Sequence, residues 1–189
     1  MTATVNAMDL HLKELTISAR GVKSAAVVNA KGDAVSYTFD DFTMTPFGPS
    51  SFDKDPQATR QQLDVRLGSA EPFFQNLDNW AIAYISEHSE RLFRKKLSAE
   101  QITERYHPCV RTSEKHPSLL RTKINLGGNN FCLFWNSKEE LVEAPESWKI
   151  EFRPRVDISH LWVMGSSCGL VLTCSHLLLA ETKEVAFPF

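Results

Sequence analysis

The sequence contains no apolar run long enough to span a membrane. A spanning helix needs about 20 consecutive apolar residues, whereas the longest candidate, residues 161–179, is interrupted by glycines, serines and a histidine. The first ten residues, MTATVNAMDL, lack the basic-then-apolar layout of a secretory signal. No Asn-x-Ser/Thr sequon occurs. We therefore expect an intracellular protein that is not secreted and has no membrane partner.

Cysteine pairs of the zinc-binding kind are also missing. The four cysteines fall at irregular spacing without a Cys-x-x-Cys pair: Cys109, Cys132, Cys168 and Cys174. His107-x-Cys109 and Cys174-x-His176 offer ligand types, but not the paired spacing of known zinc modules. The sequence therefore predicts reduced, mostly buried thiols, and neither a metal nor a cofactor.

A complete catalytic motif is absent as well. Residues 165–169, GSSCG, match the nucleophile elbow of α/β-hydrolases, and an esterase is one alternative. That chemistry needs an acid and then a histidine after the serine, on a strand-to-helix turn. Here no aspartate follows Ser167, His176 precedes the two remaining glutamates, and the next segment has the pattern of a strand. We therefore expect a tight hairpin and no enzyme.

The net charge is low, but the charges are unevenly distributed. Residues 91–123 hold nine basic residues against three glutamates, a balance of +6. Because the whole chain carries −2, the remainder carries −8. The residues from Arg91 to Lys96 partly complement the C-terminus of a helix. The later basic residues indicate a basic face that can meet phosphate groups.

Apolar spacing predicts early strands followed by helices. Strands are expected within 10–17, 25–28, 35–39 and 63–67, with a turn at 31–33 and a loop at 46–56. Ser69 is the predicted N-cap of a helix with Pro72 in its first turn and a broad apolar stripe over 73–85. Ser98 and Gln101 form a capping box for a second helix, which ends at Tyr106-His107-Pro108.

Strands return after Pro117. Leu120 to Leu126 and Phe131 to Trp135 flank a Gly-Gly-Asn-Asn turn, which predicts a hairpin. Closing it at Leu126–Phe131 places Ile124 opposite Leu133 in the core and Lys123 opposite Phe134 on the outer face. An exposed Phe134 needs a cover, either stacked bases or a helix or partner subunit.

The last strands complete the fold prediction. Residues 150–158 alternate, and Pro154 marks this strand as an edge or a bulge. Residues 161–164 and 170–179 form a central, buried final hairpin, with Trp162 and Trp135 in the core. We expect an α+β fold: a mainly antiparallel OB-like β-barrel with a helical insertion between early and late strands. Residues 1–179 form the single OB-like nucleic-acid-binding domain, and 180–189 form a C-terminal tail.

Four short segments follow one another along the chain: Leu12-Lys13-Glu14-Leu15-Thr16-Ile17-Ser18, Thr45-Pro46-Phe47-Gly48, Tyr106-His107-Pro108 and Leu161-Trp162-Val163-Met164-Gly165 followed by Gly169-Leu170. In these segments and their order the chain resembles a family of single-stranded-DNA-binding-like proteins of nucleocytoplasmic large DNA viruses. That family is similar to the short-tailed-phage single-stranded-DNA-binding proteins. The resemblance implies an OB fold, a homodimer and a role in viral DNA replication, in the host nucleus or cytoplasm.

The chain ends in Phe187-Pro188-Phe189, which places two rings around a proline and favours docking into an apolar pocket. This ending resembles the tail of bacterial single-stranded-DNA-binding proteins. Only Glu181 and Glu184 supply acid nearby, so the tail is less acidic than in those families. We expect it to recruit replication proteins.

The sequence therefore predicts a protein that binds single-stranded DNA during replication or recombination and protects exposed strands. A cationic groove would follow the phosphates while aromatic rings stack bases. The expected nucleic-acid-binding residues are Arg94, Lys95, Lys96, Arg105, Tyr106, Arg111, Arg121, Lys123, Phe134, Arg153 and Arg155. The alternative is a structural or virion interaction protein that self-associates without nucleic acid.

Overall fold

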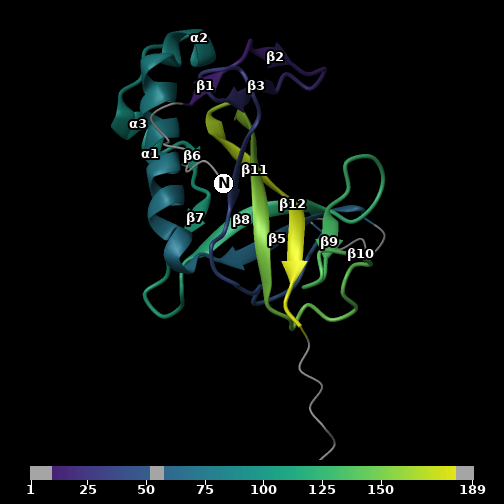
Figure 1. Ribbon diagram of the computed structural model, residues 1–189. Coiled ribbons are helices and arrows are strands. Elements are labelled where there is room, and N and C mark those ends of the chain that lie inside the picture. Colours follow the sequence, from purple (N-terminus) through teal and green to yellow (C-terminus); the bar gives the residue numbers. More distant parts are fainter. Residues whose placement is uncertain (1–9, 52–57, 182–189) are drawn as a thin grey trace, which may run out of the picture.

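The computed structural model describes residues 10–51 and 58–181, which form a twisted β-sheet flanked on one side by a layer of helices (Figure 1). The strands are β1 (His11–Leu12), β2 (Thr16–Ile17), β3 (Lys23–Val28), β4 (Val35–Thr38), β5 (Arg60–Arg66), β6 (Tyr106–His107), β7 (Val110–Arg111), β8 (Leu119–Asn125), β9 (Leu133–Trp135), β10 (Leu141–Val142), β11 (Phe152–Met164) and β12 (Ser167–Leu179). The helices are the 3-10 turn η2 (Gly68–Ala70), α1 (Glu71–Glu87), α2 (Ser89–Phe93) and α3 (Ala99–Thr103).

The long hairpin of β11 and β12 forms the centre of the sheet. Hydrogen-bonded neighbours follow the order β1-β3-β11-β12-β8-β5, and most pairings are antiparallel. This confirms the α+β class, the mainly antiparallel sheet and the central position of the last hairpin. Among the described strands the path runs from β1 to β5 without closing on itself, so the barrel stays a prediction.

The GSSCG segment forms the turn of this central hairpin. Gly165 has a φ of 60°, in the left-handed region that glycine adopts without strain. Met164 pairs with Ser167, and Val163 pairs with Cys168. The predicted tight hairpin is therefore confirmed, and the segment leads into a strand rather than a helix.

Helix α1 attaches the helical layer to the sheet. Its residues Phe74, Leu77, Ala81 and Ile85 recur at helical spacing and are fully buried, so one stripe faces the core. Pro72 lies in the first turn as predicted. The N-cap, however, is Ala70.

Both predicted caps involve serine hydroxyls, and they differ in outcome. The hydroxyl of Ser69 donates a 2.6 Å hydrogen bond to Asp41 instead of capping α1, so that detail of the prediction is wrong. Ser98 and Gln101 form both hydrogen bonds of a capping box at the start of α3, which confirms the second cap.

The predicted hairpin between residues 120–126 and 131–135 is wrong. Strands β8 and β9 both pair with β12 in parallel, with Lys123 opposite Thr173 and Phe134 opposite Leu177. The loop of residues 126–132 connects β8 to β9. A 2.7 Å hydrogen bond from the Cys132 N–H to the Asn125 carbonyl joins its two ends. The physical reason is that β5 occupies the other edge of β8, while the 13-residue β12 is long enough for two partners in succession.

Phe134 consequently lies in the core with 5% of its surface exposed, packed near Trp148. Neither of the two expected covers applies, because Trp148 and strand β12 of the same domain bury the ring. Pro154 lies in central β11, next to a register shift between Arg155 and Val156, so the bulge alternative holds rather than the edge.

All four cysteines are buried and free, as predicted. Burial raises the pKa of the Cys168 thiol to about 11 and that of Cys174 to about 12, so these thiols are poor nucleophiles at neutral pH. Within residues 10–51 and 58–181, no helix has both the length and the apolar character to cross a membrane.

Candidate nucleic-acid interface

The sheet has one face directed away from the core, which we term the outer face. Along β11, Val156, Ile158 and Leu161 are buried in the core, while residues alternating with them face outward. Residues paired across strands share a face. The outer face therefore carries Arg153, Arg155, Asp157, His160 and Trp162 of β11, Gly169, Thr173 and His176 of β12, and Arg121 and Lys123 of β8.

A hollow of about 450 Å³ opens where β5 and β8 meet this face. Arg60 and Lys123 supply its positive charge, and Ser50, Ser51, Gln61 and Gln62 supply polar groups. Gln62 lies directly opposite Lys123 in the β5–β8 pairing, and Lys123 lies opposite Thr173 of β12. The regular antiparallel register thus brings two cations from adjacent strands into one concave site, which we term the cationic hollow.

A second hollow of about 640 Å³ lies across β3 and β11. Its lining consists of Lys13, Glu14, Thr16, Ser24, Ala26, Ser159 and His160. Hydroxyls and small side chains predominate, because β3 carries serine and alanine on its outward positions. The lining offers hydrogen-bond donors and one further lysine to a ligand.

The two hollows are electrostatically connected. Burial, and then the neighbouring charge of Arg60, lower the pKa of the Lys123 ammonium. Burial also lowers the pKa of His160, with further contributions from Arg60 and Lys123. Three nitrogen bases are therefore close enough to repel one another when charged. An anion between them would relieve that repulsion.

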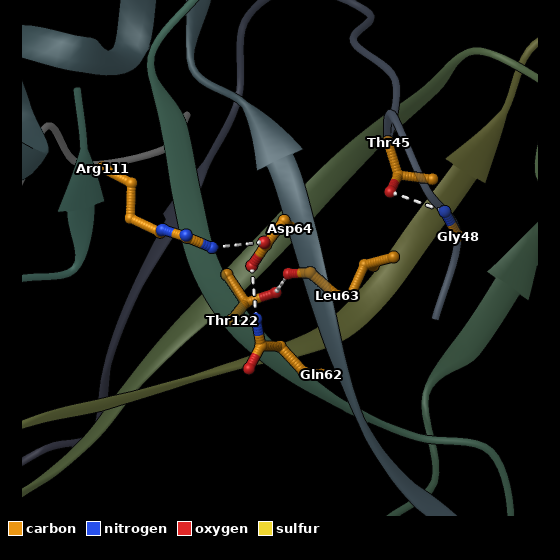
Figure 2. A network of polar contacts seen from close by, with 7 residues as sticks. All are labelled: Thr45, Gly48, Gln62, Leu63, Asp64, Arg111 and Thr122. Atoms are coloured by element: carbon orange, nitrogen blue, oxygen red, sulfur yellow. Dashed lines mark hydrogen bonds and ion pairs between the residues drawn. The ribbon is translucent and has the colours of Figure 1, made fainter. Parts of the chain in front are cut away.

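Asp64 lies beside this basic region and holds one of its arginines. Its carboxylate accepts hydrogen bonds from Arg111 at 3.2 Å and from the side-chain amide of Gln62 at 2.9 Å (Figure 2). It also lies opposite Arg121 in the β5–β8 pairing. Asp64 therefore neutralises part of the positive charge.

Two aromatic pairs occupy the outer face. Trp162 lies beside His107, with ring centroids 5.6 Å apart. Farther along β12, the indole N–H of Trp135 donates a 3.0 Å hydrogen bond to Nδ1 of His176. Trp162 and Trp135 are half-buried on the outer face and do not belong to the core cluster, so their predicted assignment to the core is wrong.

The residues predicted to bind nucleic acid do not form one patch. Arg111, Arg121, Lys123, Arg153 and Arg155 share the outer face. Nε of Arg155 lies 3.9 Å from Oδ1 of Asp157, and the guanidinium of Arg153 lies over the ring of Phe42.

The cluster Arg94, Lys95 and Lys96 follows α2 instead. The ammonium of Lys23 bonds to the Leu92 carbonyl, which places the end of α2 beside the opposite face of β3. Arg105 directly precedes β6, and its carbonyl accepts a hydrogen bond from the Cys168 N–H.

The two predicted stacking rings are not available on the surface, so this part of the prediction is wrong. Phe134 lies in the core because β9 pairs with β12 rather than β8. Tyr106 is 7% exposed, and its hydroxyl donates to Asp78. The tail residues Phe187, Pro188 and Phe189 lie outside the described residues.

Four residues on or beside the outer face were not among the predicted nucleic-acid-binding residues: Lys13, Arg60, His160 and Trp162. Trp162 alternates with Leu161 and Val163, so the period of two could have placed it on the outer face. Arg60 precedes the alternating residues of β5 and could have been found the same way. The meeting of Arg60 with Lys123 depends on strand pairing, which the local pattern does not contain.

Neither a protein-family model nor a curated protein matches this chain. Its fold is similar to that of gp2.5, a single-stranded-DNA-binding protein encoded by bacteriophage T7. The TM-score is 0.52 at 9% sequence identity, over 82% of this chain and 96% of gp2.5. At such low identity the likeness shows a shared fold.

Two structures of the single-stranded-DNA-binding protein from bacteriophage Enc34 also match. The complex with single-stranded DNA gives a TM-score of 0.48 at 8% identity, over 84% of this chain and 92% of that chain. The C-terminal truncation gives 0.49 at 7% identity, over 95% and 99%. The shared fold is shown by the T7 protein. Membership of the large-DNA-virus family stays a prediction.

Proposed function

We propose that this protein binds single-stranded DNA along the outer face of its sheet. The observation that carries the proposal is the cationic hollow, where Arg60 and Lys123 meet from adjacent strands. Both side chains are exposed and line the same hollow, so an anion bound there would offset their mutual repulsion. A backbone phosphate supplies that anion, and sheet faces of this kind track single strands by a cationic groove.

The remaining outer-face cations extend this path. Arg121, Arg153 and Arg155 lie on β8 and β11, and Lys13 lies at the second hollow. The fold shared with a T7 protein that is described as binding single-stranded DNA supports the proposal. Arg94, Lys95, Lys96 and Arg105 become secondary candidates, because their segments do not line the cationic hollow.

Protection of exposed strands in replication or recombination would be the cellular use of such binding. A homodimer and recruitment of replication proteins through Phe187-Pro188-Phe189 belong to the same proposal. Their support is the sequence resemblance.

A gel shift with labelled oligo-dT, competed by unlabelled oligo-dT or by unlabelled duplex of equal length, tests the proposal. We expect a shifted band that single strands remove and duplex removes poorly. A band equally sensitive to duplex would contradict binding at a groove for single strands. The absence of any shift would favour the alternative of a self-associating structural protein.

A further inference from the structure

Gly169 leaves room for the indole of Trp162. A Cβ placed on Gly169 would lie 3.2 Å from both Nε1 and Cζ2 of Trp162, and 3.1 Å from the carbonyl oxygen of His107. Such separations are shorter than ordinary van der Waals contacts. The indole therefore lies directly over the backbone of β12, and a methyl group at 169 would require the indole or the His107 carbonyl to shift by a few tenths of an ångström.

The surroundings of Trp162 are small or aromatic. Ser24 of β3 lies opposite Trp162 on one side, as Gly169 does on the other. The His107 ring is tilted by 39° against the indole, and His107 is exposed. A half-buried tryptophan among a serine, a glycine and an exposed imidazole retains an accessible aromatic surface.

Trp162 lies close to the second hollow. His160, which lines the second hollow, is two residues from Trp162 on the same strand and face. That separation is roughly 7 Å along the strand. A nucleotide whose base reached Trp162 would therefore bring its phosphate near Lys13 and His160.

We propose that Trp162, lying over Gly169 and flanked by His107, is a base-stacking platform for single-stranded nucleic acid. This inference rests on the proposed function and adds a contact to the face of a base, in addition to the contacts with phosphate. Aromatic stacking accepts any base, since every base has a π-face.

Trp162→Leu tests the platform with two ligands, oligo-dT and an abasic oligomer of the same length. Affinity for oligo-dT should fall between about 5-fold and 150-fold, the range expected for one stacked base. Affinity for the abasic oligomer should not change, because it offers phosphates without bases. Trp162→Phe keeps a ring and should retain most of the affinity. Gly169→Ala should weaken oligo-dT binding by less than Trp162→Leu does, since the added methyl group shifts the indole by only a few tenths of an ångström.

Trp80→Leu is the matched control. Trp80 is also half-buried, but it lies on α1 in the helical layer, so oligo-dT affinity should stay at the wild-type value. Thermal melts of all variants identify any loss that comes from unfolding. In that case the oligo-dT and abasic titrations of Trp162→Leu are made well below its melting temperature, where the variant is folded.

The outcomes separate the platform from the proposed function. If wild-type protein binds oligo-dT and Trp162→Leu weakens both ligands equally or neither, the platform is overturned while DNA binding stands. If wild-type protein does not bind oligo-dT at all, the proposed function and the platform fail together.

Discussion

The hydroxyl of Tyr106 donates a 2.7 Å hydrogen bond to the carboxylate of Asp78 on α1. The same carboxylate accepts the backbone N–H groups of Cys109 and Val110, at 3.0 and 3.1 Å. Asp78 is buried, and these bonds join the β6–β7 segment to the helical layer. Tyr106 is therefore structural, and its ring does not meet a base.

Replacing Asp78 by alanine should destabilise the protein strongly. The change leaves the Tyr106 hydroxyl and two backbone N–H groups without their acceptor, and each buried orphan costs about 1–3 kcal/mol. We expect a loss of at least about 3 kcal/mol in urea unfolding. Asn79→Ala, at the next and exposed position of α1, is the control and should change stability little. Equal stability of the two variants would contradict the role of Asp78.

Phe134→Ala should act on stability rather than on recognition. Deleting a buried phenylalanine costs about 3–5 kcal/mol, and oligo-dT affinity of the folded fraction should stay unchanged. Phe131→Ala is the control, since Phe131 is 53% exposed in the same segment. Melting curves and titrations on both variants check this. An unchanged melting temperature together with weakened oligo-dT binding of Phe134→Ala would contradict the core role and indicate that Phe134 stacks on a base.

Acidification should weaken the fold and strengthen DNA binding through His160. Its folded pKa lies below its unfolded value of about 6.5. The unfolded chain therefore takes up the proton first, and stability falls as the pH drops below about 6.5. Bound phosphate opposes the repulsion from Arg60 and Lys123, so affinity should rise over the same range.

His160→Gln should reduce both pH effects relative to the wild type. Urea unfolding and oligo-dT titrations at about pH 7.5 and about pH 5.5, on either side of the histidine pKa, measure them. An affinity that is independent of pH in the wild type, or an identical dependence in His160→Gln, would exclude His160 from the interface.

Asp64→Asn should tighten DNA binding. The change removes a negative charge from the basic region and releases Arg111 from its ion pair. Because a partly exposed pair contributes up to about 1 kcal/mol, we expect about two- to fivefold higher affinity for oligo-dT. Glu90→Gln, at an exposed position of α2, removes the same charge elsewhere and controls for the overall field. Weaker binding by Asp64→Asn would mean that Asp64 supports the site instead.

Local sequence patterns predicted the elements well. The capping box at Ser98, the apolar stripe of α1 and the final hairpin all depend on residues close in sequence, where propensity and periodicity act directly. The position of Phe134 depended on which strand β9 joins. Two partners were available to it, β8 next in sequence and β12 some 40 residues later, and local chemistry does not distinguish them.

The candidate site was predicted only in part for the same reason. Lys123, Arg121 and Arg155 alternate with core residues, so their outward direction followed from the sequence. Their neighbour Arg60 comes from a strand about 60 residues earlier, and the charge cluster at Arg94 to Lys96 belongs to a helix end. Basic residues that are neighbours in the sequence are therefore divided between different surfaces of the fold.

The most direct test compares two double charge reversals, Arg60→Glu with Lys123→Glu and Lys95→Glu with Lys96→Glu. Both change the net charge equally, but only the first alters the cationic hollow. The measurement is oligo-dT affinity as a function of salt, with melting curves as the folding control. We expect the first variant to bind at least about tenfold more weakly, with a log–log salt slope shallower by about 1.4 for two lost phosphate contacts. The second should stay within about threefold of the wild type, since a distant charge is largely screened. Equal losses in both variants, or a loss confined to the second, would contradict binding at the outer face.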